Sequence, residues 1–507
     1  MKGIAADLHA SMRAHPNTRF SIAHPDHINE MTVKDLHERA LAYGAELKPR
    51  ISNPDRTVCL IPDQDPLSTS IAILGTILTG AVPFVGNHGT TVPDHLRQTL
   101  QSIGRDIQGA HGLTPAAQDS VFAHPDLAFL QSTSGTTGLP NLCMWGHAGI
   151  ATRLKSMAEA MHLQPDDKAL CWTPLSHTVG VLNNLLLCMM TGTSLTLMDR
   201  GTFARAPLRW LSALSQTRTT QTWAPNFAVA LITGLLRDQD PGPLDLSALR
   251  AIWNAGERVD APIYQCFGAA LAKYGLSPHT LKTNYGSSEH CGGATFGPQG
   301  GELVIEGGSD LIPSAHGSLF VSVGQAAPGV SLIIRDDAGN PMPDAHLGEI
   351  CIEATGQFLG YAGQPGATTQ VLHGHELATG DLGYLRDGHL FWVGRKQETL
   401  NIRGRKIDPS QFQPVLDDAL KRATQFVAFG VDDTANGTQN AVLIMEANND
   451  LVATERMVRR AILTRFGITL HRVIVVMPGV LRKTALGKTR HRHYKRLYLA
   501  GHFDAAP

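Results

Sequence analysis

Short apolar runs alternate with longer stretches in which apolar residues recur every three or four positions, from Thr32 to Tyr285. The short runs indicate buried strands, and the longer spacing indicates helices with one buried face. Residues 169–173, 181–190 and 194–198 form one such strand–helix–strand unit. Strands that alternate with helices build parallel sheets covered on both faces, so this part of the chain is predicted to be α/β.

The individual elements follow from the same spacings. Thr32 can cap a helix, because Asp35 stands three positions later and can return the hydrogen bond. The predicted helices cover residues 32–48, 181–190, 207–215, 228–236 and 261–272, and the predicted strands cover residues 57–62, 169–173, 194–198, 220–223, 251–253 and 281–285.

Residues 67–87 lack charged side chains and are apolar enough to suggest a membrane span. The segment also contains several Ser and Thr residues, Gly80 and Pro83. A buried helix that ends near Gly80, followed by a buried strand at 81–85, explains this composition better. We therefore expect no membrane span.

The pattern changes near Gly317, where short strands follow one another without helices. Two of them, 384–386 and 389–393, flank Asp387-Gly388, a strong hairpin signal. The remaining strands are predicted at 318–323, 331–335, 349–353, 425–430, 441–446 and 472–477, and helices at 409–422 and 455–466. We predict a large N-terminal domain, residues 1–395, with a β-rich subdomain at about 317–394, and a small α+β C-terminal domain, residues 396–507.

Composition supports more than one core. A chain of 507 residues exceeds the roughly 250–300 residues that one hydrophobic core supports. Hydrophobic residues make up 43% of the chain and charged residues 17%, as in globular proteins. The net charge of −1 disfavours a nucleic-acid partner, since such binders usually carry a basic excess.

The seven cysteines form no C-x-x-C pair, and their odd number and low density fit reduced thiols in a cytoplasmic protein. The first residues include Asp7, His9 and His15 and lack the apolar core of a signal peptide. We therefore expect a cytoplasmic location.

Residues 131–140, QSTSGTTGLP, place hydroxyl side chains around Gly135 and Gly138. Glycines let backbone N–H groups approach an anion, and hydroxyls can donate to phosphate oxygens. No Gly-Lys-Ser/Thr sequence follows, so this is not a Walker A loop. An ordinary polar loop is the alternative interpretation.

Four further segments contain candidate chemistry. Residues 285–289, YGSSE, end a predicted strand, where a Tyr ring can stack on a purine and a Glu can hold Mg²⁺. Asp381, within 379–383, can accept hydrogen bonds from both ribose hydroxyls. The others are residues 394–409 and the basic segment 482–490, which alone would be a solvated tail.

In this order and spacing, the five segments resemble the adenylate-forming superfamily, which includes acyl-CoA synthetases, fatty acyl-AMP ligases, peptide-synthetase adenylation domains and luciferases. The resemblance covers almost the whole chain, because segments 174–180, 224–227, 254–257 and 348–361 also fit it. Residues 203–210 and 224–227 look most like fatty acyl-AMP ligases.

The resemblance implies an AMP-forming acid–thiol ligase with ATP and Mg²⁺ as cofactors, and it assigns roles to single residues. The phosphate grip would consist of Ser132, Thr133, Ser134, Gly135, Thr136, Thr137 and Gly138. The adenosine and α-phosphate would be held by Gly256, Glu257, Tyr285, Gly286, Ser287, Ser288, Asp381 and Arg395. The catalytic residues would be His177, Glu289, which holds Mg²⁺, and Lys488, which bridges the carboxylate to the α-phosphate.

The resemblance places the acyl pocket around His177, Val181, Asn183, Asn184, Asn226, Asn254 and Ala255. The adjacent Asn183 and Asn184 would narrow it and add amides that need partners. They predict a short, medium or polar carboxylic acid instead of a long fatty acid, unless both face the helix exterior. Residues 174–180 lack the Asp that pairs with an α-amino group, which disfavours an amino acid.

Several positions depart from the family pattern. Asn141 replaces a basic residue after the loop and predicts a weaker hold on ATP, and Gln397 replaces the usual hinge Asp or Lys. Thr178 stands where fatty acyl-AMP ligases have Asp. Residues 363–377 leave no room for the insertion that hinders CoA use in those ligases, so CoA and an acyl or peptidyl carrier protein both stay open as acceptors.

In the family, the small domain moves after adenylation so that a phosphopantetheine thiol can enter. Two other hypotheses stay open here. Asn141 and Gln397 also suit a catalytically weak adenylate-binding protein, and a phosphotransferase that releases ADP is disfavoured by the missing Walker lysine. His290-Cys291 is interpreted as structural, because adjacent residues lack metal-ligand spacing.

Overall fold

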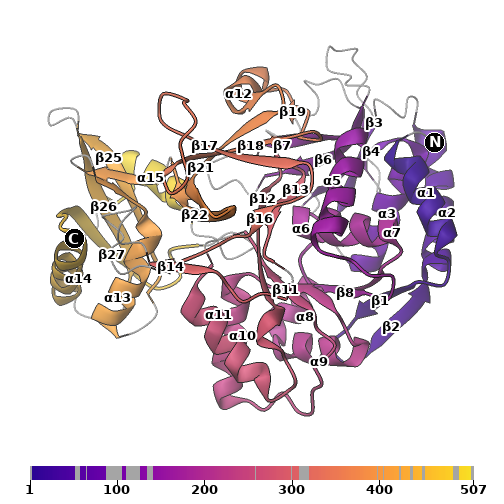
Figure 1. The fold of residues 1–507 in the computed structure, drawn as a ribbon, viewed down its shortest axis with the longest axis horizontal. Coiled ribbons are helices and arrows are strands. Elements are labelled where there is room, and N and C mark those ends of the chain that lie inside the picture. Colours follow the sequence, from indigo (N-terminus) through magenta and orange to yellow (C-terminus); the bar gives the residue numbers. More distant parts are fainter. Residues whose placement is uncertain are drawn as a thin grey trace.

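A computed structural model describes residues 3–51, 57–63, 65–86, 106–109, 126–133, 141–256, 259–298, 300–307, 319–396, 398–402, 405–421, 424–433, 438–447, 451–482 and 490–503. These residues form a large body of two helix-covered sheets, a β-rich part beside it, and a small C-terminal part far from the N-terminus (Figure 1). The predicted α/β fold is confirmed. The domain boundary at 395/396 stays a prediction.

The larger sheet has nine strands in the order β16-β13-β12-β11-β10-β8-β9-β1-β2. Its strands from β12 to β1 are parallel, as predicted, and antiparallel strands that the pattern did not predict extend both edges. The bounds are β1 (Arg19–Ala23), β2 (Ile28–Thr32), β8 (Lys168–Cys171), β9 (Ser194–Met198), β10 (Gln221–Trp223), β11 (Ala251–Asn254), β12 (Leu281–Ser287), β13 (Gly292–Phe296) and β16 (Gln325–Ala326).

The second sheet has the order β19-β7-β6-β4-β3-β5. Strands β3 to β6 are parallel, and β7 returns antiparallel to β6, so residues 133–141 connect two neighbouring strands. The bounds are β3 (Thr57–Pro62), β4 (Val82–Gly86), β5 (Asp106–Gly109), β6 (Leu127–Ser132), β7 (Leu142–Gly146) and β19 (Gly360–Tyr361).

Two hydrophobic cores cover opposite faces of the nine-stranded sheet. Ala169 and Cys171 of β8 belong to one core and Leu170 to the other, because successive side chains alternate in a strand. The first core contains α1 (Ile4–Ala14), α2 (Val33–Leu47), α3 (Pro66–Thr79), α5 (His147–Ala160) and α7 (Leu187–Thr191), and the second contains α8 (Arg200–Arg205), α9 (Leu208–Thr217), α10 (Asn226–Asp238) and α11 (Ala261–Ala272).

Several sequence signals are confirmed at helix ends. Thr32 and Asp35 form the predicted capping box of α2. The apolar helix α3 ends at Gly80, which takes a left-handed conformation at φ 85°, and β4 follows. Across the described residues, the structure contains no helix with the length and apolarity that a membrane span requires.

The segment 181–190 differs from its prediction as one regular helix. A short helix α6 (Thr178–Gly180) continues into a π-helix (Val181–Leu186) and then into α7. Periodicity of apolar residues could not reveal this, because a wide turn shifts the spacing by only one position.

The β-rich part contains a five-stranded sheet and a smaller two-stranded one. Asp387 and Gly388, at φ 51° and 76°, form the predicted hairpin turn between β21 and β22. The bounds are β14 (Ile305–Gly307), β15 (Leu319–Val321), β17 (Val330–Arg335), β18 (Gly348–Ala354), α12 (Pro365–Val371), β20 (Leu372–His373), β21 (Glu376–Arg386) and β22 (His389–Arg395).

The C-terminal part has hydrophobic cores of its own. The predicted helix 409–422 begins as a 3₁₀ turn (Pro409–Gln411), and the sequence did not predict α15. The bounds are β23 (Leu400–Ile402), β24 (Arg405–Ile407), α13 (Phe412–Leu420), β25 (Phe426–Asp433), β26 (Thr438–Glu446), α14 (Leu451–Phe466), β27 (Leu470–Val476) and α15 (His491–Leu499).

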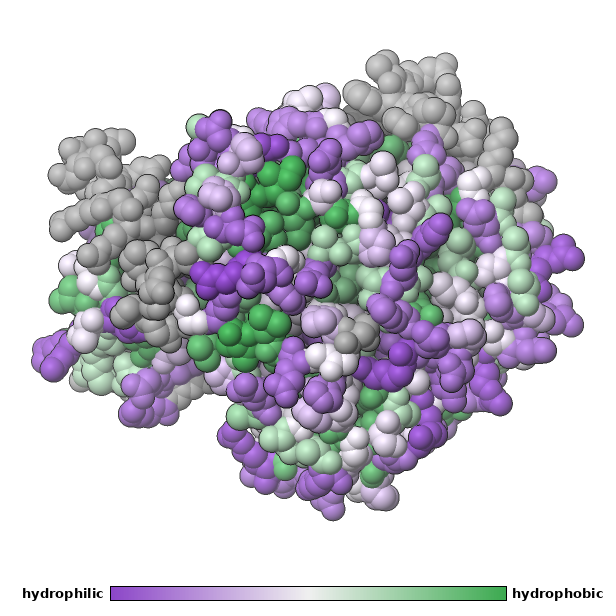
Figure 2. Space-filling view, in the orientation of Figure 1, coloured by the Kyte–Doolittle hydropathy of each residue, from purple (hydrophilic) through white to green (hydrophobic). Residues whose placement is uncertain are grey.

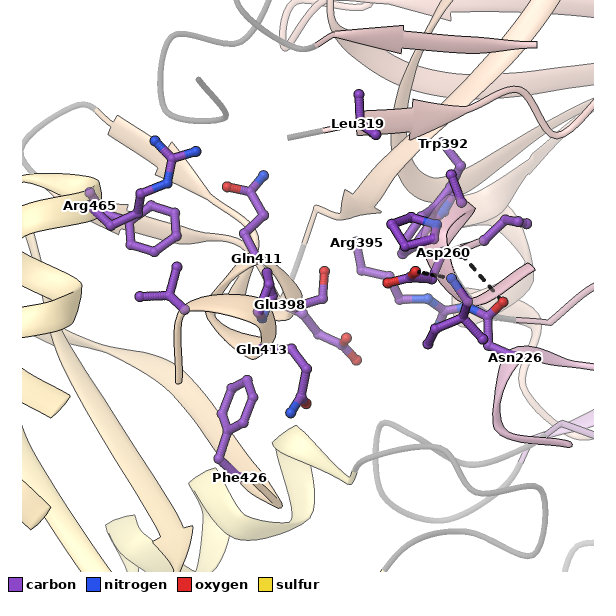
Figure 3. Close-up of a pocket in the computed structure, with 18 of the residues that line it drawn as sticks. Asn226, Asp260, Leu319, Trp392, Arg395, Glu398, Gln411, Gln413, Phe426 and Arg465 are labelled. Atoms are coloured by element: carbon purple, nitrogen blue, oxygen red, sulfur yellow. Dashed lines mark hydrogen bonds between the residues drawn. The ribbon is translucent and has the colours of Figure 1, made fainter. Parts of the chain in front are cut away.

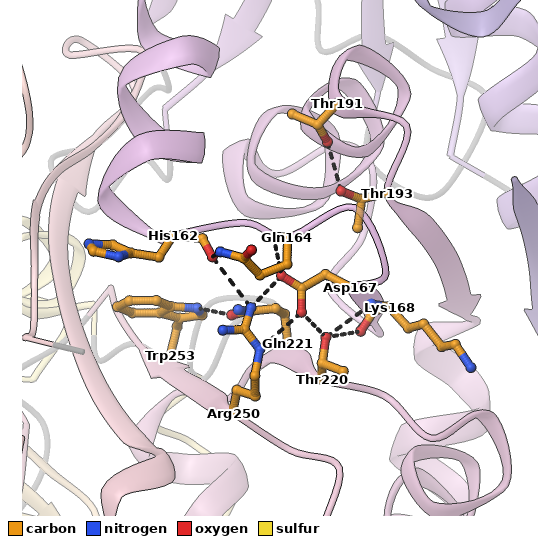
Figure 4. Close-up of polar contacts among 10 residues, drawn as sticks. All are labelled: His162, Gln164, Asp167, Lys168, Thr191, Thr193, Thr220, Gln221, Arg250 and Trp253. Atoms are coloured by element: carbon orange, nitrogen blue, oxygen red, sulfur yellow. Dashed lines mark hydrogen bonds and ion pairs between the residues drawn. The ribbon is translucent and has the colours of Figure 1, made fainter. Parts of the chain in front are cut away.

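An ion pair with a buried carboxylate lies at the amino edge of the parallel strands (Figure 4). Asp167, just before β8, pairs with Arg250, just before β11, and accepts hydrogen bonds from the Gln164 backbone at 2.7 Å and from the Thr220 hydroxyl at 2.5 Å. This network ties three strands together at the edge away from their carboxyl ends.

All seven cysteines lie within the described residues and are free thiols. Six are buried, and Cys266 on α11 is exposed.

Candidate active site

A cavity of about 1110 Å³ lies between the carboxyl edge of the nine-stranded sheet and the C-terminal part (Figure 3). Its lining from the body includes six predicted site residues, namely Asn226, Gly256, Tyr285, Gly286, Asp381 and Arg395. Its lining from the C-terminal part includes Gln411, Phe426 and Arg465, which the sequence analysis did not predict. Figure 2 shows hydrophobic surface in the hollow between the two parts.

Asp381 links three elements inside this cavity. The register of β21 and β22 places it opposite Arg395, whose Nε lies 3.1 Å from Asp381 Oδ1. The Tyr285 hydroxyl, at the end of β12, donates to Oδ2 at 2.7 Å. Asp381 raises the pKa of Arg395, and burial, with help from Asp381, raises the pKa of Tyr285. At neutral pH the Asp381 carboxylate therefore contacts one cation, Arg395, and one neutral donor, the Tyr285 hydroxyl.

The end of β11 forms the neighbouring wall. Asn254 is buried and donates through Nδ2 to Asn226 Oδ1 at 2.7 Å, and the same oxygen accepts from the Asp260 backbone N–H at 3.4 Å. Gly256, two residues later, takes φ 90°, which a side chain would disfavour. The intervening Ala255 is half-buried, and Glu257 lies outside the described residues.

The turn after β12 holds Ser288 and Glu289 by contacts from distant elements. The Trp145 indole donates to the Ser288 carbonyl at 2.7 Å, and the Thr178 and Ser288 hydroxyls lie 2.9 Å apart. The Tyr361 hydroxyl donates to Glu289 Oε1 at 2.8 Å. These contacts fix the direction of both side chains.

Glu289 offers a carboxylate suited to a hard cation. No cluster of three or more His, Cys, Asp or Glu side chains with metal-binding geometry occurs among the residues described. One carboxylate fits Mg²⁺, which is commonly held by one or two protein carboxylates together with substrate phosphates and water. His290, the next residue, is buried; desolvation, with Arg153 nearby, lowers its pKa to about 3, consistent with a structural role.

The structure describes only the two ends of the predicted phosphate loop. Ser132 ends β6, and Thr133 exchanges hydrogen bonds with Asn141: its N–H donates to the Asn141 carbonyl at 2.9 Å, and its hydroxyl accepts from the Asn141 N–H at 3.1 Å. The Asn141 side chain accepts from Gln364 at 3.2 Å. Ser134, Gly135, Thr136, Thr137 and Gly138 lie outside the described residues, as do Lys488 and Gln397.

The segment with His177 is tied to both sheets. His177 caps α6, because its Nδ1 accepts from the Val179 N–H at 3.2 Å. The preceding Ser176 donates to Asp63 at 2.7 Å through its hydroxyl, and its carbonyl accepts from Gln131 at 2.8 Å. The strand before the glycine-rich loop therefore contacts the segment predicted to bind the acid.

The π-helix buries both asparagines. Asn184 donates to the Val179 carbonyl at 2.7 Å, and Asn183 keeps Oδ1 without a partner within the described part of the chain. Val181 is also buried. Both amides are buried, and their place in an acyl pocket stays a prediction.

Sequence reasoning missed the roles of three side chains. Trp145, Thr178 and Tyr361 contact the Ser288–Glu289 turn from elements far along the chain. Tyr361 and Thr178 lie in segments that fit the family pattern, but no spacing rule links them to that turn.

Comparisons with known proteins agree with the geometry. Residues 89–362 match the family model described as AMP-binding enzyme. The chain is 27% identical to a long-chain-fatty-acid–AMP ligase, FadD32, of Mycolicibacterium smegmatis over 76% of this chain and 72% of the relative. It is 25% identical to a 4-hydroxyphenylalkanoate adenylyltransferase of Mycobacterium tuberculosis over 94% and 87%.

Among solved structures, the chain is similar to one from a study of fatty acyl-adenylate ligases of E. coli and L. pneumophila. The TM-score is 0.83 at 22% identity, over 100% of this chain and 99% of the other. At this identity the similarity concerns the fold.

Proposed function

The chain belongs to the AMP-binding enzyme family, and from this premise we propose that it uses ATP to activate a carboxylic acid as an acyl-adenylate. A carboxylate oxygen attacks the α-phosphorus, the bond to the β-phosphate oxygen breaks, and pyrophosphate leaves. A phosphopantetheine thiol then attacks the acyl carbon, and AMP leaves as the thioester forms. The acceptor is CoA or a carrier protein.

The observation that supports this proposal is the cavity with Tyr285, Asp381 and Arg395 on one wall. A carboxylate held between a cation and a neutral hydroxyl suits the two hydroxyls of a ribose. Gly256 and Tyr285, which both line the cavity, would form the slot for the adenine ring. The pairing of Asp381 with Arg395 holds that carboxylate in place before the nucleotide arrives.

The reacting groups would be collected at the Ser288–Glu289 turn. Ser288 would donate to the α-phosphate, and Glu289 would hold Mg²⁺, which neutralises charge on the phosphates. Lys488 would stabilise the charge that develops as the two anionic reactants meet. His177 would lie beside the acid, whose pocket we place among Val181, Asn183, Asn184, Asn226, Asn254 and Ala255.

We propose a short, medium or polar acid as substrate, supported by the buried Asn183 and Asn184. A cytoplasmic location is supported by the seven free thiols.

Carboxylate-dependent exchange of labelled pyrophosphate into ATP tests the activation step. Exchange with one or more acids, with AMP and not ADP as the final product, supports the proposal. Absence of exchange across a broad panel of acids would instead favour an adenylate-binding protein. Addition of CoA or a phosphopantetheinylated carrier protein then identifies the acceptor.

Lys488→Ala tests the two-step scheme. The variant should lower exchange by roughly 10²–10³ while leaving thioester formation from a preformed adenylate largely intact. Lys495→Ala on α15 is the matched control and should exchange normally. Equal loss of both half-reactions in the Lys488 variant would contradict separate steps.

A further inference from the structure

Arg153, on α5, is a buried cation that forms no ion pair with a carboxylate among the described residues. Its side chain is fully buried, and its Nη1 donates to His290 Nε2 at 3.3 Å. The other side of that imidazole meets Gln357 Oε1 at 2.9 Å, so His290 accepts from Arg153 and supplies no negative charge. Arg153 Nε and Nη2 have no hydrogen-bond partner among the described residues.

Two other arginines show what Arg153 lacks. Arg250 uses Nε and Nη2 to bind both carboxylate oxygens of Asp167, and Arg335 uses the same two atoms to bind Glu376. Their side chains are 38% and 27% exposed, so Arg153 is the most buried of the three. In Arg250 and Arg335, the edge formed by Nε and Nη2 binds a carboxylate. In Arg153 the same edge is unpaired, although Arg153 is the most buried of the three and burial makes an unpaired charge more unfavourable.

The position of Arg153 connects it to the proposed reaction site. Its partner His290 directly follows Glu289. Two residues further, Gly292 packs so closely against the π-helix and α5 that an added Cβ would lie 3.0 Å from Asn183 Oδ1 and 3.3 Å from Met157 Sδ. Met157 stands one helical turn after Arg153. Arg153 and the proposed acyl-pocket residue Asn183 thus border the same short turn.

We propose that Arg153 binds a second carboxylate at the far end of the substrate, and that the protein activates a short dicarboxylic acid. This inference rests on the proposed function and names the substrate class of that site. One carboxylate reacts at the Ser288–Glu289 turn, while the other stays ionised and receives the Nε and Nη2 protons in a two-point contact. A monocarboxylic acid of equal length leaves the buried guanidinium unpaired.

The test compares acids of matched length in the exchange assay with the full-length protein: butyrate with succinate, valerate with glutarate, and hexanoate with adipate. The wild type should favour the better diacid over its monoacid partner by at least roughly 100-fold in kcat/KM, because a site built for a polar group rejects an analogue that lacks it. This comparison does not depend on any variant.

Variants then assign the preference to the side chain. Arg153→Met should abolish the diacid preference, and Arg153→Lys should retain part of it. Lys155→Met, which removes an exposed cation from the same helix, should keep the wild-type preference. If Arg153→Met does not fold, protection of the wild type against thermal unfolding provides the second measurement, with succinate or glutarate raising Tm and the matched monoacid having no effect.

The outcomes separate the two proposals. If monoacids give a kcat/KM in exchange equal to or higher than that of the matched diacids, the dicarboxylate assignment is wrong, while the proposal of adenylation is unaffected. A diacid preference that survives in Arg153→Met overturns the role of Arg153. Exchange with no acid at all overturns adenylation and the substrate class together.

Discussion

At the scale of single residues, the site is built from side chains held by partners far away in sequence. Tyr361 holds Glu289 across 72 positions, and Trp145 holds Ser288 across 143. A hydrogen bond to one oxygen of a metal-binding carboxylate orients the other, which commonly changes metal affinity by about 10–100-fold.

Tyr361→Phe is therefore expected to raise the Mg²⁺ concentration needed for half-maximal pyrophosphate exchange by roughly 10-fold or more. The rate at saturating Mg²⁺ should change less. Tyr384→Phe, which removes a hydroxyl bonded to Glu306 in the β-rich part, is the control. An unchanged Mg²⁺ requirement in Tyr361→Phe would rule out the positioning role.

Asp167 serves stability instead of chemistry, because its network lies at the amino edge of the sheet (Figure 4). Asp167→Ala removes one carboxylate that three groups contact. We expect a loss of about 1.5–3 kcal/mol in the free energy of unfolding, measured by urea denaturation. The KM for ATP should stay the same, and a large change in KM would contradict this separation.

At the scale of elements, β12 and β13 form a hairpin that tolerates no side chain at Gly286. A Cβ there would lie 2.0 Å from the Gly292 carbonyl oxygen, so the backbone would have to move. The strands hold Tyr285 on one side of this contact and the Ser288–Glu289 turn on the other.

Gly286→Ala is expected to abolish exchange and to lower Tm, since the hairpin cannot close as it does now. Gly234→Ala in α10 is a matched control, because an added Cβ there meets nothing within 4 Å. That control should be stabilised by about 0.5–1 kcal/mol, as alanine is a better helix former. Normal activity in Gly286→Ala would show that the hairpin adapts.

The sequence predicted the bounds of helices and strands better than the contacts between them. Strands β3 and β9 and helix α11 have the predicted bounds, because composition and capping act locally. The sequence did not predict the π-helix and the antiparallel edge strands, because they depend on neighbours from other parts of the chain. The contact of Asp381 with Tyr285 could be expected only through the family resemblance, since no local rule brings residues 96 positions apart together.

At the scale of the whole molecule, one cavity joins the body and the C-terminal part. Residues from α11, β12 and β22 line it on one side, and residues from α13 and α14 line it on the other (Figure 3). A nucleotide bound in this cavity would therefore contact or shield both parts.

Binding of AMP is expected to slow hydrogen exchange in both parts of the chain. Protection should appear in residues 254–263 and 376–396 of the body and also in residues 409–419 and 457–466 of the C-terminal part. Hydrogen exchange followed by mass spectrometry measures this, with adenine-free ribose phosphate as the control ligand. Protection confined to the body would show that the nucleotide leaves the C-terminal part free.

The exposed thiol of Cys266 offers a way to observe nucleotide binding in the unmodified protein. Burial raises the pKa of Cys59 to about 11 and that of Cys171 to about 12, which suppresses the thiolate that reacts with maleimides. A fluorophore should therefore attach at one position without prior removal of other cysteines. Because the first turn of α11 lines the cavity, the colour and intensity of such a dye would follow each catalytic cycle as it happens.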